Sequence, residues 1–82
     1  MDYEVEYRTA ASKETIGVPE HAYVALVDAL RAVGRDPFDP ATSRPTSVVN
    51  VRHVVFAQSG LALVFVDTTE RRVWVFRIIW AG

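Results

Sequence analysis

The 82-residue sequence contains no cysteine. This absence excludes disulfide bonds, thiolate metal sites and cysteine nucleophiles, and it is typical of proteins from a reducing compartment. No apolar run approaches the ~18 residues that a membrane-spanning helix requires. The opening residues, Met1-Asp2-Tyr3-Glu4, lack the basic and apolar regions of a secretory signal. We therefore expect a single cytoplasmic domain over residues 1–82, with no membrane association.

An excess of charge of one sign is also lacking. The formal net charge is −1, which argues against avid, nonspecific binding to nucleic acid, because such binding depends on many Lys or Arg contacts to phosphate. The charges are nevertheless unevenly distributed: residues 1–39 carry eight acids and four bases, whereas residues 40–82 carry five arginines and two acids. Half of the residues are hydrophobic, too many for a disordered chain. The sequence predicts a folded domain with a basic carboxy-terminal half.

Three apolar runs, at residues 48–58, 61–67 and 72–80, dominate that half. They are rich in Val, Ile, Phe and Trp, and the breaks between them are short enough for hairpins, which predicts three antiparallel strands. The last run alternates, and we expect its aromatic face to form the core. That face consists of Arg72, Trp74, Phe76, Ile78 and Trp80. Arg77 would then lie on the uncovered face.

The preceding half predicts one strand and two helices. Residues 2–9 alternate as a fourth strand, residues 10–16 suit a short helix, and residues 19–33 form a longer helix that begins at Pro19 and is terminated by Gly34. In the proline-containing loop that follows, Phe38 should pack against the core. The predicted fold is α+β, a four-stranded antiparallel sheet with one or two helices on one face, in the order β-α-α-β-β-β.

The uncovered face of the sheet holds the candidate functional residues. In the first apolar run we expect the face with His53 and the valines beside it to be buried, which places Arg52 on the uncovered face. The basic candidates for binding phosphate there are Arg8, Arg52, Arg71 and Arg77, beside Glu4 and Glu6. An ordinary solvated face with cross-strand ion pairs, worth ~0.2–1 kcal/mol each, would explain the same residues.

Motifs for metal or cofactor chemistry are not present. The two histidines, His21 and His53, fall on different predicted elements, and the acids Asp36 and Asp39 lack the oxygen spacing of a calcium site. The sequence contains no glycine-rich phosphate loop, nucleophile elbow or His-Glu-x-x-His motif. We expect neither a metal nor a cofactor.

Several short motifs occur in a recognisable order. They are Tyr3-Glu4-Val5-Glu6-Tyr7, Val18-Pro19, Arg35-Asp36-Pro37, and Gly60 followed by the apolar residues 61–66 and Asp67. As an ordered set they resemble the RelE/ParE toxin superfamily of bacterial type II toxin-antitoxin modules, over nearly the whole chain. The resemblance implies a toxin that a cognate antitoxin neutralises, with ribosome-dependent mRNA cleavage in the RelE branch and DNA gyrase inhibition in the ParE branch.

The sequence departs from the mRNA-cleaving branch of that superfamily. Its members share a basic surface, an arginine soon after the third-strand glycine, and a terminal His or Arg followed by Tyr. Here Gly60 is followed by residues 61–63, Leu-Ala-Leu, and Trp80-Ala81-Gly82 stands where the terminal group would lie. We therefore expect a toxin that acts through a protein target.

Two other hypotheses stay open at this point. One is a metal-independent mRNA endoribonuclease that meets mRNA on the ribosome. In it, Arg52, Arg77 and His53 would be catalytic and Arg8, Arg71, Glu4 and Glu6 would bind the substrate. The other is a catalytically degenerate member of the superfamily, or a small scaffold that self-associates as a homodimer.

Overall fold

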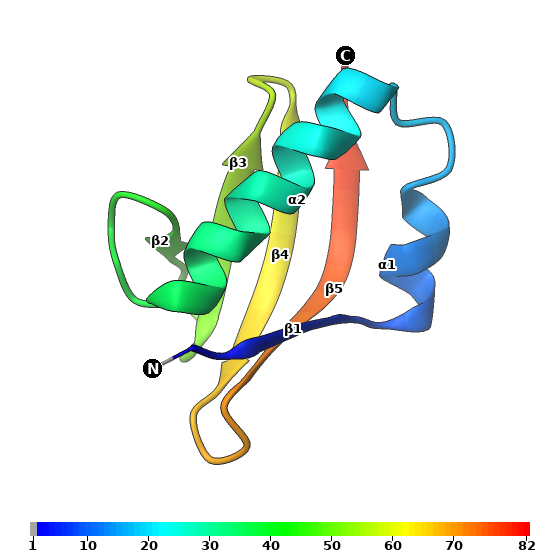
Figure 1. Ribbon diagram of the computed structural model, residues 1–82. Helices are drawn as coiled ribbons and strands as arrows, with labels where there is room; N and C mark the ends of the chain where they lie inside the picture. The colour runs from blue at the N-terminus through cyan, green and yellow to red at the C-terminus, as the bar shows by residue number, and fades with distance from the viewer. Residues whose placement is uncertain (1) are drawn as a thin grey trace.

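The computed structural model describes residues 2–82 and places two helices against one twisted sheet (Figure 1). In chain order the elements are β1 (Glu4–Tyr7), α1 (Thr9–Glu14), α2 (Glu20–Arg35), β2 (Arg44–Pro45), β3 (Val51–Phe56), β4 (Gly60–Asp67) and β5 (Arg72–Trp80). The predicted α+β class and order of elements are confirmed. No helix in the described part of the chain is long and apolar enough to cross a membrane.

The sheet has one more strand than predicted. Its order is β1-β5-β4-β3-β2, and the three apolar runs form antiparallel neighbours as expected. The added strand is β2, a two-residue segment of the proline-containing loop that pairs with β3. The prediction of an entirely antiparallel sheet is wrong for β1, which runs parallel to β5. Both helices and three strands lie between β1 and β5 in sequence, so no hairpin constrains their relative direction.

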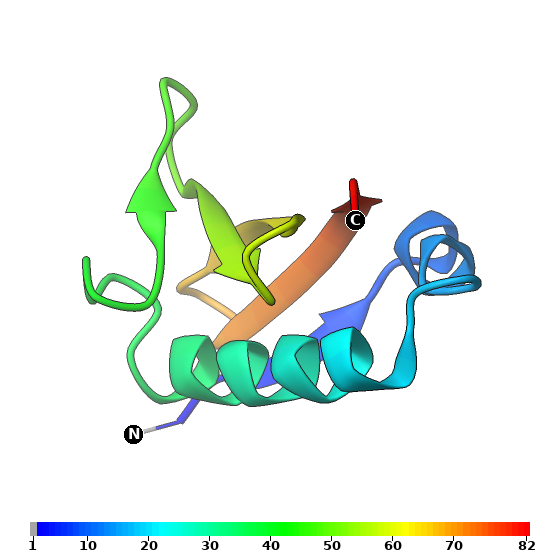
Figure 2. The ribbon, with the colours of Figure 1, turned by 90° about the horizontal axis from the view of Figure 1, so that it is seen from above.

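Helix α2 crosses one face of the sheet (Figure 2). Glu20 in its first turn and Arg35 in its last turn both complement the helix dipole. The prediction that Gly34 terminates the helix is wrong, because α2 includes Gly34 and ends at Arg35. Gly34 lies where the helix meets the start of the chain: the Tyr3 N–H donates to the Gly34 carbonyl at 2.7 Å, and a Cβ at residue 34 would lie 3.1 Å from the Tyr3 carbonyl oxygen.

The hydrophobic core lies between α2 and the sheet. Each of its largest members has less than 2 % of its surface exposed; they are Leu26, Val33, Val54, Val64, Val66, Val73 and Val75. Tyr3, Val5 and Tyr7 of the first segment pack against this core, as their alternation predicted. Helix α1 covers the edge of the core beside β5, with Ala11 fully buried.

A β-bulge divides β5 into two halves. Leu63 lies opposite Arg77 but Val64 lies opposite Val75, so Phe76 is an extra residue on β5. An extra residue reverses the alternation of every side chain after it. The core side of β5 is therefore odd-numbered before the bulge and even-numbered after it.

This bulge overturns the prediction that one aromatic face of β5 forms the core. Val73 and Val75, placed on the uncovered face by the sequence pattern, are fully buried, whereas Trp74 and Arg72 are partly exposed. Only Ile78 and Trp80 contact the core as expected. The simple alternation failed because it allowed no bulge.

The predicted faces of β3 are also inverted. Val54 and Phe56 are buried and Arg52 is only 7 % exposed, whereas His53 and Val55 are exposed. Burial of Phe56 and Val54 under α2 determines this register, and the polar group of Arg52 is satisfied locally. Phe38, expected in the core, is 43 % exposed and lies beneath the Arg52 guanidinium, 5.5 Å from the ring centroid.

Candidate functional site

The face of the sheet turned away from α2 is largely apolar along its centre. This open face is formed by alternate residues of β3, β4 and β5, namely Val51, Val55, Leu61, Leu63, Phe65, Trp74 and Ile79. Cross-strand partners continue the surface from strand to strand: Val55 faces Leu61, Leu61 faces Ile79, and Phe65 faces Trp74. Val55 remains 62 % exposed, Ile79 41 % and Phe65 39 %. Contiguous exposed apolar surface of this kind is typical of a binding site.

Cations border the open face on its β1 side. The Arg8 and Arg72 guanidinium carbons lie 4.7 Å and 5.8 Å from the centroid of the Trp74 ring. Arg72 also forms an ion pair with Glu6, with 3.1 Å between its Nη1 and the Glu6 Oε2. These contacts form one cluster of four residues, Glu6, Arg8, Arg72 and Trp74. Within it, the Glu6 carboxylate balances the charge of Arg72.

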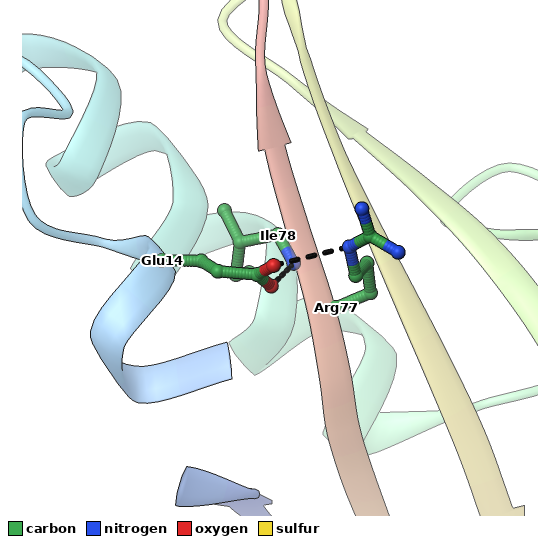
Figure 3. Close-up of polar contacts among 3 residues, drawn as sticks. All are labelled: Glu14, Arg77 and Ile78. Atoms are coloured by element: carbon green, nitrogen blue, oxygen red, sulfur yellow. Dashed lines mark hydrogen bonds and ion pairs between the residues drawn. The ribbon is translucent and has the colours of Figure 1, made fainter. Parts of the chain in front are cut away.

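Arg77 projects from the open face just after the bulge. Its Nε lies 3.0 Å from the Glu14 Oε2, and the other oxygen of the same carboxylate accepts a hydrogen bond from the Ile78 N–H at 2.8 Å (Figure 3). Glu14 therefore both neutralises Arg77 and binds α1 to the backbone of β5. The predicted position of Arg77 on the uncovered face is confirmed.

Arg52 does not belong to the open face. Its Nε donates to the Ser43 Oγ and its Nη2 donates to the Ser43 carbonyl at 2.9 Å, while the Ser43 hydroxyl donates to the Pro37 carbonyl at 2.9 Å. The buried guanidinium thus holds the loop that joins α2 to β2. The sequence-based placement of Arg52 beside Arg77 is wrong.

His53 lies beside a hollow of about 310 Å³ at the edge of the open face. The hollow is lined by Val55, by residues 40–43 of the loop, and by Arg44, the cross-strand partner of His53. The His53 imidazole makes no hydrogen bond within residues 2–82. Leu63 of β4 lies between His53 of β3 and Arg77 of β5, its two cross-strand partners, so the three residues form one row across the sheet.

The remaining candidates, Glu4 and Arg71, lie away from this row. Arg71 occupies the β4–β5 turn with φ at 57°, and its guanidinium lies 4.9 Å from the centroid of the Tyr3 ring. Its carbonyl accepts the N–H of Glu4, whose side chain is exposed. In the described part of the chain, no cluster of three or more His, Asp or Glu residues is arranged to hold a metal ion.

The sequence reasoning missed the apolar members of the open face. In β4 both alternating sets are apolar, so Leu61, Leu63 and Phe65 could not be distinguished from buried Ala62 and Val64 by hydropathy. The size of the side chains does distinguish the two alternating sets of β4. The smaller set is buried under α2, whereas the larger set lies outside.

The sequence matches no protein-family model and no curated protein. Its structure, however, is similar to several solved toxins. The chain superposes on the RelBE2 toxin-antitoxin complex of Mycobacterium tuberculosis with a TM-score of 0.83, 18% identity, and coverage of 99% of this chain and 100% of that one. For the isolated E. coli RelE toxin the TM-score is 0.84, with 17% identity and coverage of 98% and 85%.

An archaeal structure extends the comparison. The RelE-RelB complex of Pyrococcus horikoshii gives a TM-score of 0.79 at 11% identity, with coverage of 100% of this chain and 98% of that one. At these identities the likeness concerns the fold. The chain has the RelE fold, which confirms the RelE/ParE-like architecture that the ordered motifs predicted.

Proposed function

We propose that this chain is the toxin of a type II toxin-antitoxin module, that it works in the cytoplasm, and that it acts by binding a protein target. The fold supports the first part, because similar structures are RelE toxins and complexes of RelE with RelB antitoxins. The ordered sequence motifs point in the same direction. A cognate antitoxin is accordingly the expected partner.

The apolar open face is the observation that favours a protein target over RNA. Binding to RNA draws affinity from cations on phosphate and from stacking of bases on exposed aromatic rings. On this surface Arg77 is neutralised by Glu14 and Arg72 by Glu6, while Arg52 is buried behind the sheet. A centre of leucine, valine, isoleucine and phenylalanine side chains instead suits the core of a protein interface.

Induction in cells tests this function. We expect growth arrest when the gene is induced alone, and normal growth when the adjacent reading frame is induced with it. Phe65→Asp should remove toxicity while the protein remains folded, because the charge would be buried in the interface. Val24→Asp, on the exposed side of α2, is the matched control and should stay toxic. Normal growth with the wild-type gene alone would contradict the proposal.

One observation favours RNA cleavage as a second candidate. His53 and Arg77 flank Leu63 on the same face, so a group able to transfer a proton and a cation share one row of the sheet. Purified protein should then cleave ribosome-bound mRNA, and His53→Ala should abolish cleavage without unfolding the domain. Intact mRNA after incubation with wild-type protein would exclude this candidate. Arg52 is left out of the catalytic set because it is buried.

A further inference from the structure

The outer backbone edges of the sheet lie on β2, on the part of β3 beyond β2, on the part of β5 beyond β1, and on β1. At one side, β2 is only two residues long and includes Pro45, which has no N–H to offer. At the other side, β5 extends beyond β1, but the Ile78 N–H on that stretch is bound by the Glu14 carboxylate (Figure 3). The outer edge of β1 has no neighbouring strand along its whole length.

Strand β1 leaves its outward backbone groups unpaired. The Glu4 N–H donates to the Arg71 carbonyl at 3.0 Å and the Arg8 N–H to the Val75 carbonyl at 2.8 Å, so the even-numbered residues direct their backbone groups toward β5. The N–H and C=O of Val5 and Tyr7 therefore point away from the sheet. None of these four groups makes a hydrogen bond within residues 2–82.

An apolar groove of about 150 Å³ lies beside this edge, between β1 and α2. It is lined by Val5 and Tyr7 of the strand and by Val27, Leu30 and Arg31 of the helix. Arg31 is exposed and has no carboxylate partner in the described part of the chain. The edge thus combines unpaired backbone groups, an apolar floor and a free cation.

We propose that β1 binds an extended segment of the antitoxin as an added strand of the sheet. The inference rests on the proposed toxin function and specifies the partner. Alternate residues of the segment would be apolar, to fill the groove, and an acidic residue would reach Arg31. The residues between them would be basic, because Glu4 and Glu6 lie on the other side of β1.

Charge also shows why the occupant is not a second copy of this chain. Antiparallel pairing of two β1 strands through Val5 and Tyr7 would place Glu6 directly opposite Glu6 of the copy. Like charges directly opposite each other in a sheet are destabilising. Acidic residues on an edge strand are a device against self-association, and here they leave the edge to a partner with basic residues. The homodimer expected as an alternative from the sequence is disfavoured at this edge.

Two fusion proteins test the edge directly. Each carries a strand of about seven residues ahead of residue 1, joined by a flexible Gly/Ser linker that gives a millimolar effective concentration. One strand alternates valine with lysine, and the other alternates valine with glutamate. We expect amide exchange at Val5 and Tyr7 to slow about tenfold or more with the lysine strand only, as newly formed hydrogen bonds would require. Glu6, already paired with β5, is the internal control.

Absence of slowing with the lysine strand would overturn the edge proposal, and equal slowing with both strands would overturn its charge preference. The second arm uses the protein encoded by the adjacent reading frame. Tyr7→Pro removes one outward N–H without breaking the ladder to β5, and it should weaken that complex about tenfold. Tyr7→Ala, which also removes the ring but keeps the backbone donor, is the matched control and should bind more tightly than Tyr7→Pro.

The two arms separate the two proposals. If the wild-type chain forms no complex with the neighbouring protein and is not toxic, the proposed function fails, and the fusion proteins still decide the edge. If the complex forms and suppresses toxicity while the Val5 and Tyr7 amides exchange as fast as in the free protein, the edge proposal is wrong and the toxin function stands. This exchange measurement on wild-type protein does not depend on the folding of any variant.

Discussion

The Glu14 carboxylate accepts a hydrogen bond from the Ile78 backbone N–H at 2.8 Å, although the two residues lie 64 positions apart in sequence (Figure 3). The same carboxylate holds Arg77 at 3.0 Å. One side chain therefore closes an edge of the sheet, attaches a short helix and neutralises a cation of the open face.

We expect Glu14→Ala to lower the free energy of unfolding by about 1–2 kcal/mol, because the Ile78 N–H loses its partner in a partly buried position. Glu14→Gln should cost less than about 1 kcal/mol, since the amide oxygen can still accept that hydrogen bond and only the exposed ion pair with Arg77 is lost. Urea unfolding of both variants measures the difference. Equal losses would show that the ion pair, not the backbone contact, holds α1.

Variants of Arg52 and Arg77 test whether these two arginines have different roles, although both were predicted to lie on the uncovered face. Arg52→Ala removes two hydrogen bonds to Ser43 in a buried position and should destabilise the domain by about 1–3 kcal/mol. Arg77→Ala removes one ion pair whose arginine side chain is 57% exposed, and should cost less than about 1 kcal/mol. Thermal and urea unfolding provide the comparison. A larger loss for Arg77→Ala would contradict these assignments.

The main helix, the three hairpin strands and the order of elements could be predicted because each depends on local periodicity. The predicted helix at residues 19–33 and the observed helix Glu20–Arg35 differ only at their ends. Helix periodicity is set by residues three and four apart, and a hairpin by the length of its turn. Such signals are contained within a short stretch of sequence.

The faces of β3 and β5 could not be predicted because each depends on contacts distant in sequence. The bulge at Phe76 arises in the pairing of β5 with β4, and nothing in residues 72–80 alone marks it. The burial of Arg52 depends on Ser43, a loop residue that supplies its hydrogen bonds. Without that partner, an arginine is expected on the surface. Of the three candidate catalytic residues, Arg77 therefore lies on the predicted face, whereas Arg52 and His53 lie on the opposite faces.

Neighbouring valines of β3 test the corrected faces. Val54 is fully buried under α2, whereas Val55 is 62 % exposed on the open face. Val54→Asp should destabilise the domain by about 3 kcal/mol or more, because an unpaired carboxylate would enter the core. Val55→Asp should leave the unfolding midpoint nearly unchanged. Circular dichroism during thermal unfolding measures the two losses of stability. A larger loss for Val55→Asp than for Val54→Asp would support the buried face of β3 that was predicted from the sequence.

The hydroxyl of Tyr7, a residue that lines the groove beside β1, should make the stability of the domain depend on pH. Burial raises the pKa of its hydroxyl above 10.0, and the nearby Tyr23 raises it further. Because the folded-state pKa is higher than the unfolded one, this stabilisation is fully present below pH 10 and is lost as the pH rises through the folded-state pKa. Wild type should therefore lose stability relative to Tyr7→Phe, which has no hydroxyl to ionise, as the pH rises above 10.0. Urea unfolding at several pH values measures this difference, and a constant difference across the range would show that Tyr7 ionises as it does in the unfolded chain.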